Sequence, residues 1–210
     1  MTDKPWLEVS KATKSRIIPL QSGYTRVPRD SAAVRNLANL RHADINSPGV
    51  DPTLWELTLG SLPHDLLGHG DDPSPAERAV HAALVLYATH QQSRPGPMHR
   101  SGIGLGQAVR SLSQKRSGGP DWDTGTISRF HHLCRAQSST IRLENLRGLV
   151  TLLRSESVGL DYGRLAADLY RLEKGLTQQV ILTWGRQLHR MEPTTHDNPD
   201  QSPDIEGAQK

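Results

Sequence analysis

The sequence predicts an all-α protein of eight to nine helices, arranged as two small helical-bundle subdomains. Proline and glycine interrupt the 210-residue chain between segments whose apolar residues recur at helical spacing. No run of alternating β-branched residues predicts a strand. Hydrophobic residues make up 35% and charged residues 22% of the chain, which is typical of a globular protein and excludes a disordered or membrane-spanning class.

The first two expected helices are delimited by proline and by a capping aspartate. The first covers about residues 9–18 and is expected to stop at Pro19, because proline has no N–H for the helix interior. Asp30 precedes the second, at residues 31–42, and its carboxylate is suited to bind the free amides of the first turn. These signals predict two helices joined by a loop.

The third and fourth expected helices each begin with a capping residue followed by proline. Asp51 opens a helix at about residues 52–62, in which Trp55 belongs to the apolar face. Ser74 opens a helix at about residues 75–92, which is apolar on nearly every side in its middle. A helix of that kind is normally surrounded by others, so we expect it to be the central strut of the N-terminal half.

A polar loop predicts the boundary between two subdomains. A short helix at about 105–115 ends an N-terminal subdomain of residues 1–116, and residues 117–125 form the linker. Residues 126–191 form a C-terminal bundle. An acidic segment at 192–210 has almost no apolar content and is expected to be disordered.

The C-terminal bundle contains the last four expected helices. Asp161 precedes one of them as a cap, and Tyr162 and Trp184 are assigned to core packing. The four helices are expected at about residues 126–136, 140–156, 162–173 and 176–190.

The charge of the chain favours a nucleic-acid partner. The net charge is +3, but residues 192–210 hold five acidic residues and one lysine, so the remainder of the chain, with 24 basic and 17 acidic residues, carries +7. Of the 25 basic residues 19 are arginine, whose planar guanidinium suits phosphate oxygens. Aromatic residues total only 4%, which argues against recognition by base stacking and leaves the phosphate backbone as the binding target.

Two other function classes remain open at this stage. His64, Asp65 and His69 lie in a loop flanked by proline and glycine, and a His-Asp pair is a ligand set of metal-dependent phosphohydrolases. The arginines could instead serve only protein contacts, as in a helical adaptor. The single cysteine, Cys134, allows no disulfide within the chain, and no secretory signal is recognisable, so we expect a cytoplasmic protein.

Six strings follow one another in the last two thirds of the chain: PAERAVHAALVLYATHQQSR at 75–94, MHRSGIGLG at 98–106, LRGLVTLLR at 146–154, LDYGRLA at 160–166, DLYR at 168–171 and WGR at 184–186. In this order they resemble one known family, CasB, the small subunit of the type I-E CRISPR complex Cascade. The resemblance covers about residues 29–190.

The resemblance implies a non-enzymatic helical subunit without cofactor or metal. It would be present as two copies beside CasA, CasC, CasD, CasE and a CRISPR RNA, and it would stabilise the R-loop of guide and target DNA without reading sequence. The nucleic-acid-binding positions that we expect from it are Arg35, Arg41, Gln92, Arg94, His99 and Arg100, followed by Arg147, Arg154 and Arg164.

Overall fold

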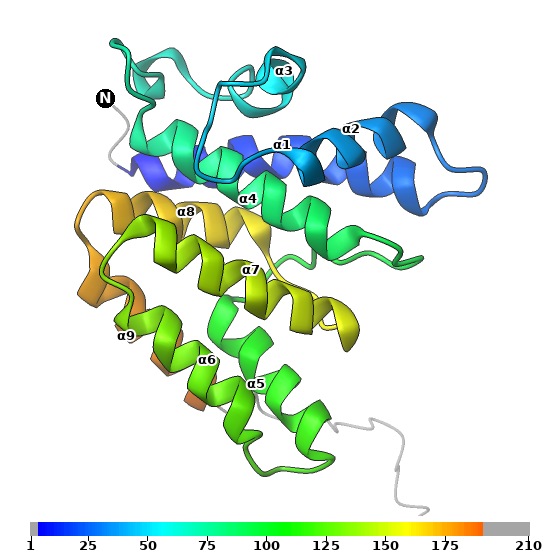
Figure 1. Cartoon of the computed structure of the whole chain (residues 1–210), viewed down its shortest axis with the longest axis vertical. Helices are drawn as coiled ribbons and strands as arrows, with labels where there is room; N and C mark the ends of the chain where they lie inside the picture. Colours follow the sequence, from blue (N-terminus) through cyan, green and yellow to red (C-terminus); the bar gives the residue numbers. More distant parts are fainter. Residues whose placement is uncertain (1–3, 191–210) are drawn as a thin grey trace, which may run out of the picture.

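The computed structural model describes residues 4–190, and this part of the chain is all-α, which confirms the predicted fold class (Figure 1). Two single turns of 3-10 helix, Pro52–Leu54 and His64–Leu66, flank α3. The acidic segment predicted at 192–210 lies outside the described residues. The α-helices are α1 (Pro5–Thr25), α2 (Ser31–His42), α3 (Trp55–Thr58), α4 (Pro75–Gln91), α5 (Leu105–Ser117), α6 (Thr124–Arg135), α7 (Ser139–Ser155), α8 (Tyr162–Glu173) and α9 (Thr177–His189).

Side-chain caps begin the helices where the sequence predicts them. The Asp30 carboxylate accepts a hydrogen bond from the Ala33 amide at 3.1 Å, which starts α2. At the start of α4, Ser74 Oγ accepts from the Glu77 amide while the Glu77 carboxylate accepts from the Ser74 amide. This reciprocal pair satisfies two amides that would otherwise lack a partner.

The predicted stop at Pro19 is wrong, because α1 continues through this residue to Thr25. Pro19 is exposed, so the carbonyl that loses its partner can be hydrated. The extra turns bury Leu20 and Tyr24, which are 5% and 6% exposed. Burial of these two side chains offsets the cost of an interior proline, about 3 kcal/mol.

The third predicted helix is much shorter than expected. Only Trp55–Thr58 is α-helical, and the preceding turn is a 3-10 helix. Trp55 is 49% exposed, and its indole Nε1 donates to the Gly49 carbonyl at 2.6 Å. Trp55 therefore closes a loop, and the prediction that it belongs to the apolar face of a longer helix is wrong.

Helix α4 is the centre of the molecule, as its apolar middle predicts. It packs against α1, α2, α7 and α8, and α8 also packs along α1 (Figure 1). Every side chain from Ala79 to Ala88 is buried. Tyr162 of α8 meets two rings of α4 in the core: Tyr87 edge to face, with ring centroids 5.4 Å apart, and His90, with ring centroids 5.9 Å apart.

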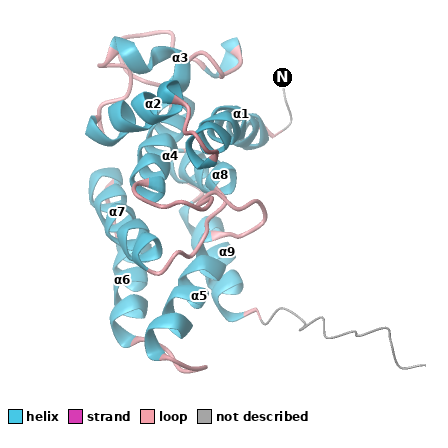
Figure 2. Ribbon diagram, turned by 90° about the vertical axis from the view of Figure 1, so that its right-hand side faces the viewer, coloured by secondary structure: helices cyan, strands magenta, loops and turns pink. Residues whose placement is uncertain are grey.

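Helices α5, α6 and α9 form the other end of the molecule (Figure 2). Helix α5 packs against α9 and α6, and α7 bridges α6 and α4. Trp184 of α9 is fully buried, as predicted, and its Nε1 donates to the Asp168 carboxylate at 2.7 Å. Buried side chains of both ends join one continuous core, and the division at residues 117–125 stays a prediction.

None of the helices in residues 4–190 is both long enough and apolar enough to cross a membrane.

Candidate nucleic-acid interface

The loop after α4 and the segment before α8 lie against each other and bring most of the predicted binding residues together. We call these two stretches, together with the adjoining ends of α7 and α8, the junction; it comprises residues 92–104 and 154–164. The Leu160 amide donates to the Met98 carbonyl at 3.0 Å, and the Arg100 amide donates to the Leu160 carbonyl at 3.1 Å. The Asp161 amide donates to the Ile103 carbonyl at 2.8 Å. These backbone bonds fix the loop in one position on the molecule.

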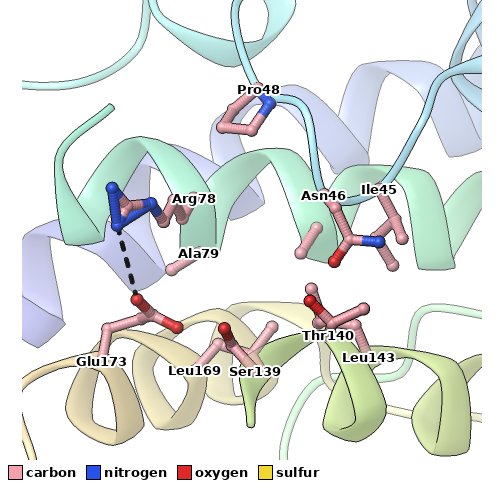
Figure 3. A pocket seen from close by; sticks show the side chains of 11 residues that line it. Ile45, Asn46, Pro48, Arg78, Ala79, Ser139, Thr140, Leu143, Leu169 and Glu173 are labelled. Atoms are coloured by element: carbon pink, nitrogen blue, oxygen red, sulfur yellow. Dashed lines mark ion pairs between the residues drawn. The ribbon is translucent and has the colours of Figure 1, made fainter. Parts of the chain in front are cut away.

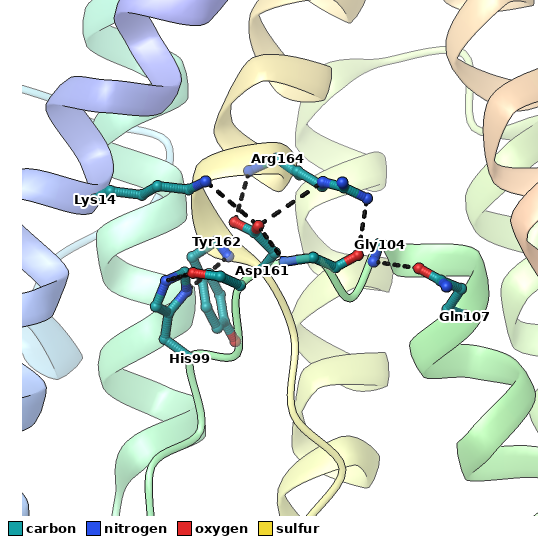
Figure 4. A network of polar contacts seen from close by, with 9 residues as sticks. Lys14, His99, Gly104, Gln107, Asp161, Tyr162 and Arg164 are labelled. Carbon is teal, nitrogen blue, oxygen red and sulfur yellow. Dashed lines mark hydrogen bonds and ion pairs between the residues drawn. The ribbon is translucent and has the colours of Figure 1, made fainter. Parts of the chain in front are cut away.

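Asp161 is the fully buried anchor of the junction. Its carboxylate accepts hydrogen bonds from the amides of Gly102 at 2.8 Å and Arg164 at 3.0 Å. Lys14 and Arg164 reach the same carboxylate from opposite sides, at 3.5 and 3.8 Å (Figure 4). Burial raises the pKa of Asp161, but the two amides and the positive charge of Lys14 outweigh it and hold the pKa below its ordinary value.

His99 lies beneath the surface of the junction. The residue is 5% exposed, its amide donates to Gln21 Oε1 at 2.8 Å, and its Nδ1 accepts from the Tyr162 amide at 3.2 Å. Burial lowers the pKa of the imidazole, so the ring is neutral at pH 7. This position supports a role in holding the loop and does not support direct phosphate contact; binding by His99 stays a prediction.

Arg94 and Arg154 are fixed at the C-terminal ends of α7 and α4. Arg94 donates to Ser157 Oγ at 3.1 Å and to the Ser155 carbonyl at 3.2 Å. Arg154 donates to the Thr89 carbonyl at 3.3 Å and to Gln92 Oε1 at 2.7 Å. Carbonyls at the end of a helix attract a cation, but they do not neutralise it. Both guanidinium groups are therefore positioned while they keep their charge.

Arg100 and Arg164 are the exposed cations at the other side of the junction. The side-chain stem of Arg100 crosses Gly159, where a Cβ would come within 2.5 Å of Arg100 Cδ. The stem is thus held against backbone, and the Arg100 guanidinium forms no hydrogen bond or ion pair with any other described residue. Arg164 donates to the Gly102 carbonyl at 2.8 Å, which ties the start of α8 to the loop.

Three predicted arginines lie outside the junction. Arg35 is exposed on α2, and Arg41 is half-buried on the same helix. Arg147 is half-buried on α7, and its Nε is buried without a hydrogen-bond partner in the described part of the chain. In residues 4–190, no side-chain ion pair joins these three arginines to the junction, so the sequence-based set divides into one assembled group and three separate positions.

The predicted arginines are poor in acidic partners. Within residues 4–190, only Arg164 of the seven forms an ion pair; the carboxylates of this region pair instead with other cations, such as Arg16, Arg78 and Arg116. Lys115 adds a further charge beside the junction by donating to the Glu156 carbonyl at 2.9 Å. The junction therefore presents positive charge that the described part of the chain leaves largely uncompensated.

A pocket between α4, α7 and α8 does not gather the predicted residues (Figure 3). It has a volume of about 200 Å³, and Leu143 and Leu169 form part of its wall. Its only lining cation, Arg78, is paired with Glu173 at 3.7 Å across the opening. Because this charge is already compensated, the pocket is a poor site for an anion.

The alternative metal site is not assembled. His64, Asp65 and His69 are all exposed, and the two imidazole rings have their centroids 6.1 Å apart. No group of three or more His, Cys, Asp or Glu residues within 4–190 is arranged to hold a metal ion. The geometry gives the phosphohydrolase hypothesis no support.

Comparisons with known proteins agree with one another. The family model described as CRISPR-associated protein Cse2 matches residues 36–189. The crystal structure of CasB from Thermobifida fusca is similar to this chain, with 34% sequence identity and a TM-score of 0.71. The similarity covers 87% of this chain and 98% of that one. Among curated proteins, no sequence matches this chain.

Proposed function

The chain belongs to the Cse2 family of CRISPR-associated proteins, and from this premise we propose that it is the small, non-catalytic subunit of a Cascade complex. In this role it contacts the phosphates of the CRISPR RNA–target DNA R-loop and keeps the loop open independently of sequence. Its partners are the CRISPR RNA, the target DNA, the subunits CasA, CasC, CasD and CasE, and a second copy of itself.

The uncompensated charge of the junction is the observation that supports this proposal. Arg94, Arg100 and Arg154 have no carboxylate partner in the described residues, so their charge is available to phosphates. R-loop formation exchanges one duplex for another of similar stability. A few contacts of about 1 kcal/mol each are therefore enough to shift the balance toward the open loop.

The junction is also organised before any strand arrives. Arg94 and Arg154 are held by carbonyl and hydroxyl oxygens, and the stem of Arg100 lies against Gly159. Side chains that are already ordered lose less conformational entropy on binding than free ones. This arrangement favours contact with phosphates at fixed positions along a strand.

The aromatic residues of the described chain support backbone contact instead of base reading. Trp55 and Trp122 are the aromatic side chains with substantial exposure in residues 4–190, at 49% and 41%. Neither belongs to the junction, and Trp122 packs edge to face against His189 with ring centroids 5.7 Å apart. Without an aromatic platform beside the arginines, binding should be the same for different sequences.

Fluorescence anisotropy of labelled single-stranded DNA, RNA and duplex DNA, measured with the full chain over a salt series, tests the proposal. We expect weak, sequence-independent binding that falls steeply with salt, and no cleavage on parallel gels. The double variant R94Q/R100Q should lower the salt slope by about 1.4 on single strands, at about 0.7 for each lost phosphate contact.

The control is R129Q/R135Q, which removes two exposed arginines of α6 that have no side-chain partner in the described region. This control loses the same two positive charges as R94Q/R100Q, and it should lower the salt dependence of binding by less. Cleavage, or no binding even at low salt, would contradict the proposal. Binding to other subunits that is insensitive to salt and to R94Q/R100Q would favour the adaptor hypothesis instead.

A further inference from the structure

A second basic site lies beside the junction, where the starts of α5 and α8 meet the end of α9. It is a pocket of about 250 Å³, and its wall contains three arginines and no acidic or aromatic residue. Of these arginines, only Arg164 belongs to the binding residues expected from the sequence. The six lining residues are Gln107, Arg164, Thr183, Arg186, Gln187 and Arg190.

The packing of α5 on α9 fixes the shape of this pocket. The Gly106 amide of α5 donates to Gln187 Oε1 of α9 at 3.1 Å. A Cβ on Gly106 would collide with the Trp184 carbonyl oxygen, so glycine permits the close approach of the two helices. On the third side, the bond from Arg164 to the Gly102 carbonyl holds the start of α8 in place.

The arginines of α9 are placed together in spite of their mutual repulsion. Thr183, Arg186 and Arg190 are spaced by three and four residues, which puts them on one side of the helix end. Like charges four residues apart repel each other. Neither Arg186 nor Arg190 forms an ion pair with any residue in the described range. A concave site with this charge favours an anion.

We propose that this pocket binds one phosphate group of a nucleic-acid strand, with Arg186 and Arg190 as its principal ligands and Arg164 at its edge. The pocket, at about 250 Å³, is many times larger than the space that one water molecule needs, so a phosphodiester group has room to enter. Because no aromatic side chain lines the pocket, the group recognised is the phosphate and not the base.

The site extends the junction toward α9, and it rests on the proposed function for its choice of a nucleic-acid strand as the source of phosphate. Arg164 joins the two, because it contacts Asp161 and Gly102 of the junction and also lines the pocket. A strand that leaves the junction beside Arg164 would meet the pocket next. Arg186 and Arg190 thereby become binding residues.

The full chain carrying R186Q/R190Q tests the inference, with R129Q/R135Q as the charge-matched control. Binding of a labelled 20-nucleotide oligothymidylate is measured by anisotropy over a salt series. We expect R186Q/R190Q to weaken binding at low salt by about tenfold more than the control does, as expected from loss of charge-assisted hydrogen bonds. Its salt slope should fall by about 0.7, the value for one phosphate contact. Thermal unfolding checks that both variants fold.

A second measurement uses inorganic phosphate as the probe. In ¹⁵N-labelled wild-type protein, the Nε–Hε signals of Arg186 and Arg190 should shift and saturate on titration, while those of Arg129 and Arg135 should not. If the wild type binds oligothymidylate but R186Q/R190Q behaves as the control, the inference is overturned and the proposed function stands. If phosphate shifts the two signals but no nucleic acid binds, the pocket stands as an anion site and the proposed function fails.

Discussion

Two glycine-to-alanine substitutions, one at the close contact between α5 and α9 and one on the exposed side of α7, should change the stability of the protein in opposite directions. In Gly106→Ala, the new methyl group would meet the Trp184 carbonyl, and it would come within 2.8 Å of the Leu188 amide nitrogen and of Gln187 Cβ. Two of these three atoms belong to the backbone and cannot rotate away, so α5 must shift from α9. Overpacking of this kind costs about 1–3 kcal/mol. We expect a net loss of about 2 kcal/mol.

Gly148→Ala is the matched control in the interior of α7. Gly148 is exposed, and a Cβ there would have no heavy atom within 4 Å. Alanine is favoured over glycine inside a helix by about 0.5–1 kcal/mol, because glycine loses more backbone entropy on folding. This variant should therefore be more stable than the wild type by about that amount.

Thermal and urea unfolding of the two variants measures the difference. For a chain of this size, each kcal/mol changes Tm by about 2–4 °C. Gly106→Ala should lower Tm by about 4–8 °C, and Gly148→Ala should raise it by about 1–4 °C. An unchanged Tm in Gly106→Ala would refute the reasoning, since it would mean that the two helices are not in backbone contact at this glycine.

Three further predictions concern buried ionisable groups, and urea unfolding at several pH values checks each. Burial lowers the pKa of His90 to about 4, below the unfolded value, so the free energy of unfolding should fall as pH drops from 6.5 toward 4. In His90→Gln, the loss of unfolding free energy between pH 7 and pH 5 should be smaller than in the wild type by about 2 kcal/mol. Burial raises the pKa of Asp168 to about 6, which has the opposite sign, so its contribution is lost as pH rises from about 4 to 6. Asp168→Asn keeps an acceptor for Trp184. As pH rises from 4 to 7, its free energy of unfolding should increase by about 2–3 kcal/mol relative to that of the wild type. Asp161→Ala removes a cap and a buried charge and should cost about 3 kcal/mol, whereas Asp161→Asn should retain part of the stability at pH 7.

The outcomes of these tests are separable. A His90→Gln variant with an unchanged acid slope would show that the imidazole is not buried neutral. An Asp168→Asn variant that follows the wild type at every pH would contradict the raised pKa of that carboxyl. Equal losses in Asp161→Ala and Asp161→Asn would show that the charge, and not the capping bonds, is what stabilises the junction.

Local signals in the sequence predict most of the helices. Capping residues such as Asp30, Ser74 and Asp161 act on amides within three residues of themselves, so their effect is visible in a short window. The apolar middle of α4 likewise predicts burial on all sides. Pro19 misled the prediction because the burial that carries α1 past it involves residues of other helices.

The candidate site was less predictable, because its contacts join residues far apart in the chain. His99 and Tyr162 are joined by a hydrogen bond although they are 63 residues apart in the sequence, and so are Arg94 and Ser157. Sequence composition correctly marked the loop as rich in donors, but it could not show that His99 faces inward. The pocket of Arg186 and Arg190 also went unmarked, since it exists only once α5 and α8 have packed beside α9.

The most direct test of the central claim is the lifetime of the R-loop in a reconstituted complex. CasA, CasC, CasD, CasE and a CRISPR RNA are combined with wild-type protein, R94Q/R100Q or R129Q/R135Q. Closure of the R-loop, in which the displaced strand pairs again with the target strand, is then followed on several target sequences after dilution into salt. We predict that R94Q/R100Q assembles normally but loses the R-loop faster than the control, to the same extent on every target. An R-loop as long-lived with R94Q/R100Q as with the wild type would contradict the account.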